Sequence, residues 1–520
     1  MSGLTLFGKI IIEKGKVVST AFSSEDNSVS LSIDGKTYKF PDSSFSLNFT
    51  ETHAHIVGQG EKLLHPDISC VTGFQNLIDI ALNAPQRNDW IFLRGWNADN
   101  WTDFPEKPIE LLDKAFPNNP IVLVRIDGHA MLVNTLALQR AEISHTSKIE
   151  GGLVQIDGDR VPTGLLLDNA MLPVYSAIPR YEKEYVKKLI KASLNDYLSQ
   201  GVTSIHDMDV WLEYLPIFID LANDNQLDID IKSYIRAFDD RYKSKFPYPF
   251  KVNNLDICGL KFYADGALGS KGALLHEGYK DDPTNKGIQC ISEEDLLNKA
   301  EEGCSMGWEI AIHAIGDAGV TLTLNVYEKL RSLGYNNVFR IEHSQIVKAE
   351  DLIKYKDLNI MPMVQPIHCT SDTEMALRLL DETTQKRAYP WKSFWELGIF
   401  PWGGSDAPIE SNSIAEGINA FVRRLSEKSN TINQKERVSL LEALLSYSFD
   451  TFYEQKTTLN DDDYLEQLKQ SIDSGNFNIV GNSVLQMHAD STILPSEMNS
   501  WVRATIKNGR PLYISRESST

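Results

Sequence analysis

The chain has 520 residues, 42% of them apolar, which is enough to bury a large core and too much for a single small domain. Acidic residues outnumber basic ones by 71 to 51, and the net charge of −20 argues against a sequence-independent hold on nucleic-acid phosphates. We therefore expect a small-molecule substrate and no nucleic-acid partner.

The cysteines and the apolar runs bear on the cellular compartment. Five cysteines are scattered without paired-ligand spacing, and their odd number favours a reducing, cytoplasmic compartment over a disulfide framework. Residues 4–12 resemble a strand and lack the apolar core and cleavage site of a secretory signal. No other apolar run is long enough to span a bilayer, so we expect no membrane partner.

Both ends of the chain carry short strand patterns. In the first 48 residues these patterns are broken by Gly and Asp turns and lie at 9–12, 17–19, 29–33 and 37–40. Strand and hairpin patterns return at 478–488 and 501–513. We predict that 1–48 and 478–520 together form one small composite β-sandwich domain.

The segment after the first 58 residues is longer than one strand–helix step requires, up to about residue 180. We predict that the main domain covers 49–455. It would carry an insertion at about 60–180 near the mouth of the active site, where the insertion could cover the substrate as a lid.

From about residue 182 onward, helix and strand patterns alternate. Apolar residues of 182–200 recur on one helical face, the pattern ends at Gly201, and a strand pattern follows at 202–207. The same step recurs before strand patterns at 308–313, 338–343 and 360–364. Successive strands separated by single helices are typical of a parallel α/β sheet.

Two closures fit this alternation, an open doubly wound sheet and a (β/α)8 TIM-like barrel. The candidate metal ligands are spread from residue 53 to residue 406. In an open sheet, strands so widely separated along the chain would mostly keep such residues from meeting. We therefore predict the barrel, whose active sites lie where the strands end.

The candidate ligands come at the ends of separate strand patterns, and they are His53, His55, Lys261, His313, His343 and Asp406. His53 and His55 lie two apart on a predicted strand, so both side chains leave the same face and can share a metal ion. Taken alone, such a pair is more often a surface or hydrogen-bonded pair than a metal site. The other strand-end residues favour the metal.

Lys261 is the least expected member of this set. It lies in the apolar stretch 255–262, where an ammonium group facing a dry interior would be costly. One interpretation is a lysine that points to solvent or pairs with a carboxylate such as Asp265. The other is an amine that has reacted with CO2, because the resulting carbamate is a two-oxygen anion that could bridge two divalent ions.

Several motifs occur in a characteristic order, at 51–55 (ETHAH), 94–97 (RGWN), 127–130 (DGHA), 162–164 (PTG), 201–207 (GVTSIHD), 261–270 (KFYADGALGS), 312–317 (IHAIGD), 340–343 (RIEH) and 404–406 (GSD). Together they cover most of 50–410. The chain resembles the amidohydrolase superfamily of metal-dependent hydrolases. More narrowly, it resembles the amidohydrolase-3, YtcJ-like branch, which includes N-substituted formamide deformylases. That branch usually has Asp where this chain has Glu51, so the hydrogen bond behind the first histidines is expected to change without loss of the ligands.

The resemblance implies a binuclear centre with His53 and His55 on one metal and His313 and His343 on the other. Lys261 would be the carbamylated bridge between them. The cofactors would be two divalent ions and a carbamate derived from CO2. Histidine with oxygen donors suits zinc, and manganese, iron or cobalt would also be accommodated. The resemblance further suggests a homodimer.

The same resemblance makes Asp406 a ligand and a proton acceptor. A metal ion lowers the pKa of bound water from 15.7 to about 7, so a hydroxide is available at neutral pH to attack a carbonyl. Asp406 would then relay the proton to the departing nitrogen. We predict a hydrolase of carbon–nitrogen bonds other than peptide bonds, acting on an amide or formamide. The alternatives are an ester, lactone or phosphoester hydrolase, or a catalytically silent scaffold.

Four residues outside the ligand set are candidates for the substrate site. His129 resembles a residue that contacts substrate or stabilises an oxyanion, and the alternative is a hydrogen-bonded loop histidine. Asp265 and Gly266 would shape the pocket floor or merely turn the chain. Trp96 would line the pocket or belong to a core.

Overall fold

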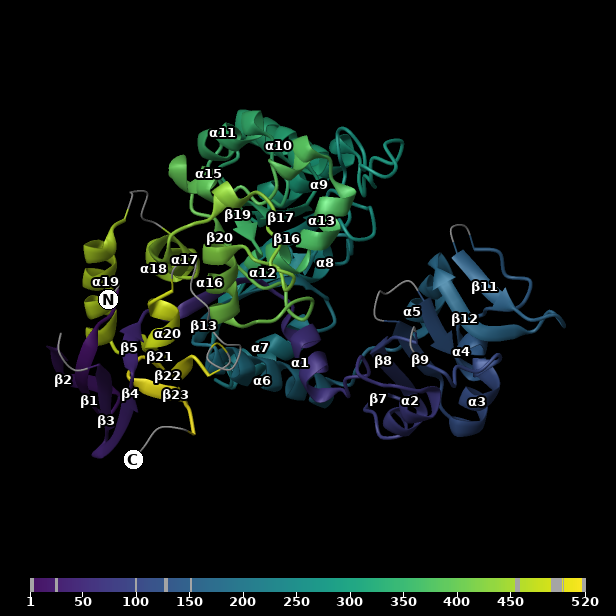
Figure 1. Ribbon diagram of the computed structural model, residues 1–520, viewed down its shortest axis with the longest axis horizontal. Helices are drawn as coiled ribbons and strands as arrows, with labels where there is room; N and C mark the ends of the chain where they lie inside the picture. Colours follow the sequence, from purple (N-terminus) through teal and green to yellow (C-terminus); the bar gives the residue numbers. More distant parts are fainter. Residues whose placement is uncertain are drawn as a thin grey trace. The chain divides into compact units, whose positions relative to one another are not determined.

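The computed structural model describes residues 4–23, 27–98, 101–125, 130–149, 152–453, 459–487, 498 and 500–516. The chain divides into two compact units, which Figure 1 colours by sequence. One unit is built from Met1–Ile56 and Leu194–Thr520, and the other is Val57–Ser193. No helix among the described residues is both long and apolar enough to cross a membrane.

The first unit contains a barrel of eight parallel strands within the described residues. In chain order these are β6 (Phe49–Ala54), β13 (Val202–Val210), β14 (Asp230–Arg236), β16 (Leu255–Tyr263), β17 (Glu309–Ala314), β18 (Phe339–His343), β19 (Ile360–Val364) and β20 (Trp402–Gly403). Each strand pairs in parallel with the next along the chain. The short β15 (Phe250–Val252) adds an antiparallel pairing to β16.

The sheet closes between its first and last strands. The Thr52 hydroxyl on β6 donates to the carbonyl of Gly403 on β20 at 3.0 Å. Just beyond β20, the amide of Asp406 donates to the carbonyl of His53 at 2.7 Å. These contacts confirm the barrel, and the open doubly wound sheet is wrong.

Helices connect the strands as the alternating pattern predicts. The main connections are α6 (Lys183–Ser199), α7 (Leu215–Asn223), α9 (Glu293–Ser305), α10 (Asp317–Ser332) and α11 (Ala349–Asp357). Gly201, Gly307 and Gly334 follow three of these helices with φ of 79°, 91° and 91°. Glycine is favoured there because a side chain would strain this left-handed conformation.

Shorter helices fill the remaining connections of the barrel. They are α8 (Tyr242–Lys245), α12 (Pro366–Ser371), α13 (Thr373–Leu379), α14 (Glu382–Gln385), α15 (Trp391–Glu396), α16 (Ile414–Arg423), α17 (Leu440–Ser446) and α18 (Phe449–Phe452). Four of them, α12 to α15, lie between β19 and β20, so this connection is much longer than the others in the carboxyl-terminal half of the barrel.

Both ends of the chain form the predicted β-sandwich. One sheet has the order β2 (Lys16–Ser23), β1 (Phe7–Glu13), β3 (Ser28–Ile33), β4 (Lys36–Pro41). The other has the order β23 (Arg510–Ile514), β22 (Val502–Lys507), β21 (Phe477–Gly481), β5 (Ser43–Ser46), so it joins segments from opposite ends of the sequence. Phe45 lies between the sheets, with ring-centroid distances of 6.4 Å to Phe22 and 5.6 Å to Phe477.

In the carboxyl-terminal segment, α19 (Asp461–Asp473) precedes β21 and the short α20 (Asn482–Leu485) follows it. The acidic run at the start of α19 has a structural role. The Asn460 side chain caps the helix by accepting from the amides of Asp462 and Asp463. Acidic residues in a first turn are favourable because the amino-terminal end of a helix dipole is positive.

The second unit has a sheet of its own. The strand order is β11 (Gly152–Ile156), β12 (Pro162–Asp168), β10 (Ala130–Val133), β9 (Ile121–Arg125), β8 (Trp90–Trp96), β7 (Gln86–Arg87). Its helical segments are α1 (Ile56–Leu64), α2 (Phe74–Ala81), α3 (Pro108–Ala115), α4 (Thr135–Arg140), η1 (Asn169–Met171) and α5 (Leu172–Ala177). Two apolar clusters give this unit a core of its own. Its predicted role as a lid over the barrel mouth stays a prediction.

Candidate metal centre

The predicted ligands gather at the carboxyl ends of the barrel strands. His53 is on β6 and His55 follows that strand, Lys261 is on β16, His313 is on β17, His343 ends β18 and Asp406 follows β20. All are buried except His55, which is half-buried. The rings are in mutual contact, with centroid distances of 4.9 Å from His53 to His343 and 4.4 Å from His313 to His343.

Hydrogen bonds fix which nitrogen of three histidines faces the centre. Nδ1 of His53 lies 2.5 Å from the Glu342 carboxylate, Nδ1 of His55 lies 2.9 Å from the Met208 carbonyl, and Nδ1 of His343 lies 2.7 Å from Oε1 of Gln365. Since each partner is an acceptor, each Nδ1 carries the proton. In the neutral form of each ring, Nε2 then keeps its lone pair, which is the tautomer that a metal ion needs.

These lone pairs converge on Asp406. Its Oδ1 lies 3.0 Å from Nε2 of His55 and 3.5 Å from Nε2 of His53. Ligand atoms that share one tetrahedral zinc ion lie about 3.3 Å apart, because zinc–ligand bonds are about 2.0–2.1 Å long. Three acceptor atoms at this spacing fit a cation between them. His343, His368 and Asp406 also offer ligand atoms within 4.8 Å of one another.

Lys261 fits neither of its ordinary interpretations. The side chain is 1% exposed, so it does not point to solvent. Asp265 is not its partner, since that carboxylate accepts from the amides of Leu274, Ile315 and Gly316 at 2.8–3.0 Å. Burial lowers the pKa of Lys261 below the ordinary lysine value. A lowered pKa gives more of the neutral amine, which is the form that reacts with CO2.

Electrostatics keep His53 and His313 neutral and Asp406 ionised. Burial would lower the pKa of His55, but the hydrogen bond and charge of Asp406 outweigh it and raise this pKa. Burial, together with the nearby charge of Lys261, lowers the pKa of His53 to about 4 and that of His313 to about 3. Burial would raise the pKa of Asp406, but the charge of His53 and the hydrogen bond and charge of His55 outweigh it and hold this pKa well below the usual range. Neutral imidazoles and an ionised carboxylate are the forms that bind divalent ions.

Two of the predicted ligands have unusual backbone conformations. His343 has φ of 75° and Asp406 has φ of 58°, both in the left-handed region that residues other than glycine rarely adopt. Such conformations persist where surrounding contacts enforce them, and they cluster at functional sites. Here the backbone turns at the strand end and directs both side chains to the centre.

The sequence matches the model of the amidohydrolase family over residues 49–458, which spans the whole barrel. The chain belongs to the amidohydrolase family. Family membership makes the protein a metal-dependent hydrolase, and the histidine and aspartate groups described above fit that assignment.

Individual relatives agree with this family. The amidohydrolase-type protein YtcJ of Bacillus subtilis (strain 168) is 31% identical over 427 residues, which cover 77% of this chain and 78% of YtcJ. The N-substituted formamide deformylase of Arthrobacter pascens is 24% identical over 77% of each chain. The fold is similar to that of an uncharacterized metal-dependent hydrolase from Pyrococcus furiosus, with a TM-score of 0.69, 23% identity and coverage of 85% of this chain and 92% of that one.

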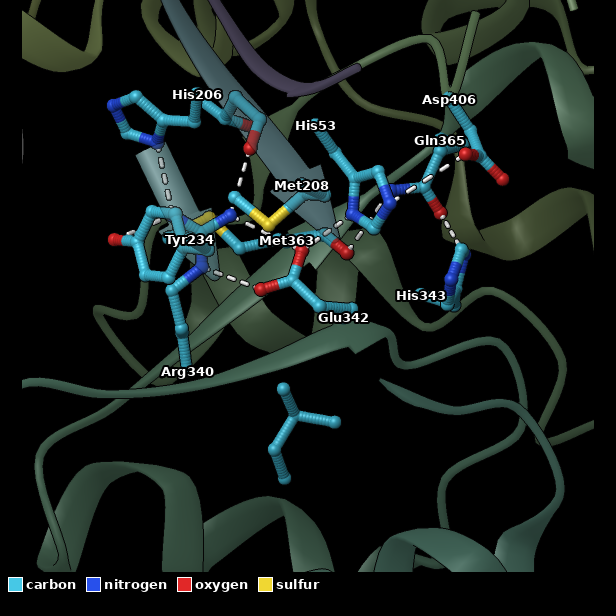
Figure 2. Close-up of polar contacts among 12 residues, drawn as sticks. His53, His206, Met208, Tyr234, Arg340, Glu342, His343, Met363, Gln365 and Asp406 are labelled. Carbon is cyan, nitrogen blue, oxygen red and sulfur yellow. Dashed lines mark hydrogen bonds and ion pairs between the residues drawn. The ribbon is translucent and has the colours of Figure 1, made fainter. Parts of the chain in front are cut away.

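Behind the ligands, this amidohydrolase contains a buried ion pair (Figure 2). Arg340 contacts both oxygens of Glu342 and donates to the Thr52 carbonyl at 2.7 Å. Arg340 also contacts Nδ1 of His206 at 2.9 Å. Burial would raise the pKa of Glu342, but the charge of Arg340 outweighs it and keeps this pKa well below the usual range. Glu342 is therefore an anion that orients His53.

Glu51 holds the backbone under the first histidine. Its Oε1 accepts from the amide of His53 at 3.0 Å and from the amide of Ser405 at 2.9 Å. The same side chain thus ties β6 to the segment that carries Asp406. Burial raises the pKa of Glu51 to about 7.

The four candidates for substrate contacts have different surroundings. Asp265 accepts from three backbone amides, and its Oδ1 also lies 3.5 Å from Nε2 of His313. The backbone of Gly266 hydrogen-bonds the same histidine. Trp96 is 4% exposed in a core of the second unit, and its Nε1 donates to the Leu123 carbonyl at 2.9 Å. His129 lies outside the described residues.

Several residues around the ligands had no role in the sequence-based prediction. Glu342 and Arg340 are part of the RIEH motif, while Gln365 and His368 follow the strand predicted at 360–364. The position of polar residues just after a predicted strand was therefore a usable signal. Nε2 of His368 has no hydrogen-bond partner in the described part of the chain and lies 4.0 Å from Oδ2 of Asp406.

Proposed function

We propose that the protein is a metal-dependent amidohydrolase that cleaves an amide or formamide C–N bond of a small molecule. The observation that carries this proposal is the convergence of the His53 and His55 Nε2 atoms on Oδ1 of Asp406, at 3.5 and 3.0 Å. The deformylase activity named for the Arthrobacter pascens relative supports a C–N bond as the target.

The proposed ligand set is His53, His55 and Asp406 with His313, His343 and a carbamate on Lys261. Two zinc ions held there would polarise the scissile carbonyl and activate water near neutral pH. The chain itself supplies the remaining requirements. Glu342 and Gln365 keep two imidazoles in the required tautomer, and burial excludes bulk water from the reacting groups.

Asp406 is the proposed proton carrier. Its low pKa keeps it ionised, so it can accept a proton from the attacking water. The protonated Asp406 carboxyl can then donate this proton to the leaving nitrogen of the substrate. An amide nitrogen must be protonated to depart. Cleavage of the C–N bond therefore needs this proton transfer in addition to polarisation of the carbonyl.

Elemental analysis of the purified protein tests the metal centre directly. We expect about two divalent ions per chain in the wild type, and a sharp fall in Lys261→Ala even when bicarbonate is supplied with the metal. Lys232→Ala is the matched control, because Lys232 is also a barrel lysine but pairs with Glu309 at 3.3 Å. This control should keep its metal.

Activity is tested on N-formyl and N-acyl compounds, with matched esters and lactones in the same screen. Hydrolysis of the nitrogen compounds that requires both the metal and Lys261 would support the proposal. Faster hydrolysis of the esters would reassign the bond. A wild type that binds no metal after reconstitution would contradict the hydrolase mechanism and favour a silent scaffold.

A further inference from the structure

A buried chain of polar contacts leads through the barrel interior to the first predicted metal ligand (Figure 2). Arg340 and Glu342 lie two apart on β18, so both side chains leave the same face of that strand. The Arg340 guanidinium is 0% exposed and donates to both oxygens of Glu342. Oε2 of Glu342 in turn lies 2.5 Å from Nδ1 of His53. The carboxylate that orients the histidine is therefore itself held by the arginine.

Each of the five N–H groups of the Arg340 guanidinium has an acceptor. Two of them donate to Glu342. The other three donate to the Thr52 carbonyl at 2.7 Å, to Nδ1 of His206 at 2.9 Å and to the Tyr234 hydroxyl at 3.1 Å. A planar guanidinium with every donor in use is fixed in one orientation. The position of Glu342 thus depends on contacts from three other strands, β6, β13 and β14.

Tyr234 is held on both sides of its hydroxyl. This hydroxyl accepts from Arg340 and donates to Oε2 of Glu309 on β17. The ring centroid of Tyr234 also lies 4.6 Å from the guanidinium carbon of Arg340. None of the predicted ligands is on β14. An effect of the Tyr234 hydroxyl on His53 would therefore pass through Arg340 and Glu342.

Two other predicted histidine ligands have neutral partners at Nδ1. His55 donates to the Met208 carbonyl at 2.9 Å, and His343 donates to Oε1 of Gln365 at 2.7 Å. An acceptor behind an imidazole raises the basicity of the nitrogen that binds a metal. A carboxylate does so more strongly than a neutral oxygen, because its charge strengthens the hydrogen bond.

His313 has a carboxylate nearby, but not one that accepts from its ring. Oδ1 of Asp265 lies 3.5 Å from Nε2 of His313, and this nitrogen has no hydrogen-bond partner among the described residues. The Asp265 carboxylate accepts from three backbone amides instead. The hydrogen bond that His313 makes is to the backbone of Gly266, which is neutral. The charged acceptor behind His53 thus distinguishes it from the other histidines.

We propose that Tyr234 and Arg340 are positioning residues that hold the Glu342 carboxylate against the first metal ligand. The ion bound by His53 and His55 is then the more tightly held of the two. This inference rests on the proposed binuclear centre. The contacts themselves join residues of this chain, so they exist in the protein before any metal is added.

Zinc titration against a competing chelator tests the unequal affinities. The wild type should bind two ions in separate steps, the second at least about 10-fold weaker, since a partner behind a ligand changes metal affinity by about 10- to 100-fold. His55→Gln should remove the tighter step, and His343→Gln should remove the weaker one. Two equal steps in the wild type, or loss of the weaker step in His55→Gln, would overturn the proposal.

Tyr234→Phe tests the positioning role by removing one hydroxyl. The tighter step should weaken about 10-fold, while the weaker step stays within about 2-fold of the wild type. Tyr327→Phe is the matched control, because the buried Tyr327 hydroxyl donates to the carbonyls of Ile310 and Arg340 and does not contact the guanidinium. Equal weakening of both steps in Tyr234→Phe would indicate a general structural effect and contradict the proposal.

A measurement without metal separates this role from the metal centre. The proton on Nδ1 of His53 should give a ¹H NMR signal far downfield of the other histidine ring protons, because a carboxylate 2.5 Å away accepts it. The signal is assigned by its absence in His53→Gln. It should move upfield in Tyr234→Phe and stay in place in Tyr327→Phe.

The two failures are distinguishable. If the wild type binds no zinc but the signal moves in Tyr234→Phe, the proposed metal centre fails while the positioning role stands. If zinc binds and the signal of His53 is the same in Tyr234→Phe as in the wild type, the metal centre stands and the positioning role is overturned.

Discussion

At the scale of single residues, the side chains behind the proposed ligands fix the tautomer and orientation of the histidines. Gln365 accepts from Nδ1 of His343 at 2.7 Å, whereas Gln345 contacts Nδ1 of His368 at 3.2 Å. The two glutamines are both buried and both serve a histidine near Asp406. They differ in that only His343 belongs to the proposed ligand set.

This pair gives a matched prediction. Gln365→Met removes the acceptor that fixes the tautomer of His343, so metal affinity should fall about 10- to 100-fold. Gln345→Met removes no contact to a proposed ligand, so metal affinity should stay within about 2-fold of the wild type. Metal affinity is measured by competition with a chelator. A larger loss in Gln345→Met would make His368 a ligand and would contradict the proposed set.

His65 provides a pH prediction away from the metal centre. Burial and the charge of Arg87 lower the pKa of His65 to about 4, and the Tyr181 hydroxyl lies 3.2 Å from its Nε2. Between pH 6.5 and 4 the unfolded chain binds a proton at this residue and the folded chain does not. Stability is therefore lost as the pH falls through this range.

The comparison that isolates this effect is His65→Gln against wild type. The free energy of unfolding of the wild type should fall relative to the variant as the pH is lowered from 7 to 4, and urea unfolding measures it. His145→Gln changes an exposed histidine of the same unit and is the control. Parallel pH profiles for wild type and His65→Gln would show that the pKa of His65 is the same in the folded and the unfolded chain.

At the scale of elements, the contact between β6 and the segment after β20 positions Asp406. A Cβ on Gly404 would lie 2.7 Å from the amide nitrogen of His53 and 2.8 Å from Oε1 of Glu51. Both atoms belong to the contact that closes the barrel. The absence of a side chain at this position therefore allows the first and last strands to approach.

Gly404→Ala should force these strands apart. We expect a loss of about 1–3 kcal/mol in the free energy of unfolding, the range for overpacking a close contact. Metal affinity should fall with it, because Asp406 moves away from His53. Gly158→Ala is the control, since a Cβ on Gly158 meets no atom within 4 Å. Chemical denaturation and chelator competition measure the two effects, and unchanged values in Gly404→Ala would show that the strands adjust without cost.

The same elements show how far the sequence alone predicts the structure. Helix ends at Gly201, Gly307 and Gly334 were predictable because a positive φ leaves a local signal. The strands around the ligands were also predictable, because apolar alternation ends in a polar residue. Closure of the barrel was predicted from the wide spread of the candidate ligands along the chain. That prediction was right, because His53 and Asp406 lie together.

Other features depend on tertiary contacts that leave no local pattern. The tautomer of His53 is set by Glu342, which is 289 residues away. The Asp265 carboxylate accepts hydrogen bonds from backbone amides of two later loops. Trp96 shows the same limit, because an aromatic residue in a motif can belong to a core as readily as to a pocket. Its burial in the second unit could not be inferred from the residue type.

At the scale of the whole molecule, all proposed metal ligands belong to one of the two compact units. His53 and His55 lie in Met1–Ile56, and the remaining ligands lie in Leu194–Thr520. The unit Val57–Ser193 has its own sheet and its own apolar clusters. A ligand that binds only the folded form stabilises the part of the structure whose unfolding would release it.

Metal removal should therefore destabilise the two units unequally. A metal at 1,000 times its Kd stabilises the folded form by about 4 kcal/mol, so chelation should raise amide hydrogen exchange in the barrel strands by up to about 1,000-fold. Exchange in the core strands β8, β9 and β10 of the second unit should stay nearly constant, because their hydrogen bonds do not depend on the ligands. Hydrogen exchange followed by mass spectrometry, with and without metal, reports both units in one sample. Equal acceleration in both would mean that they unfold as one cooperative body, and the metal would then stabilise the entire chain.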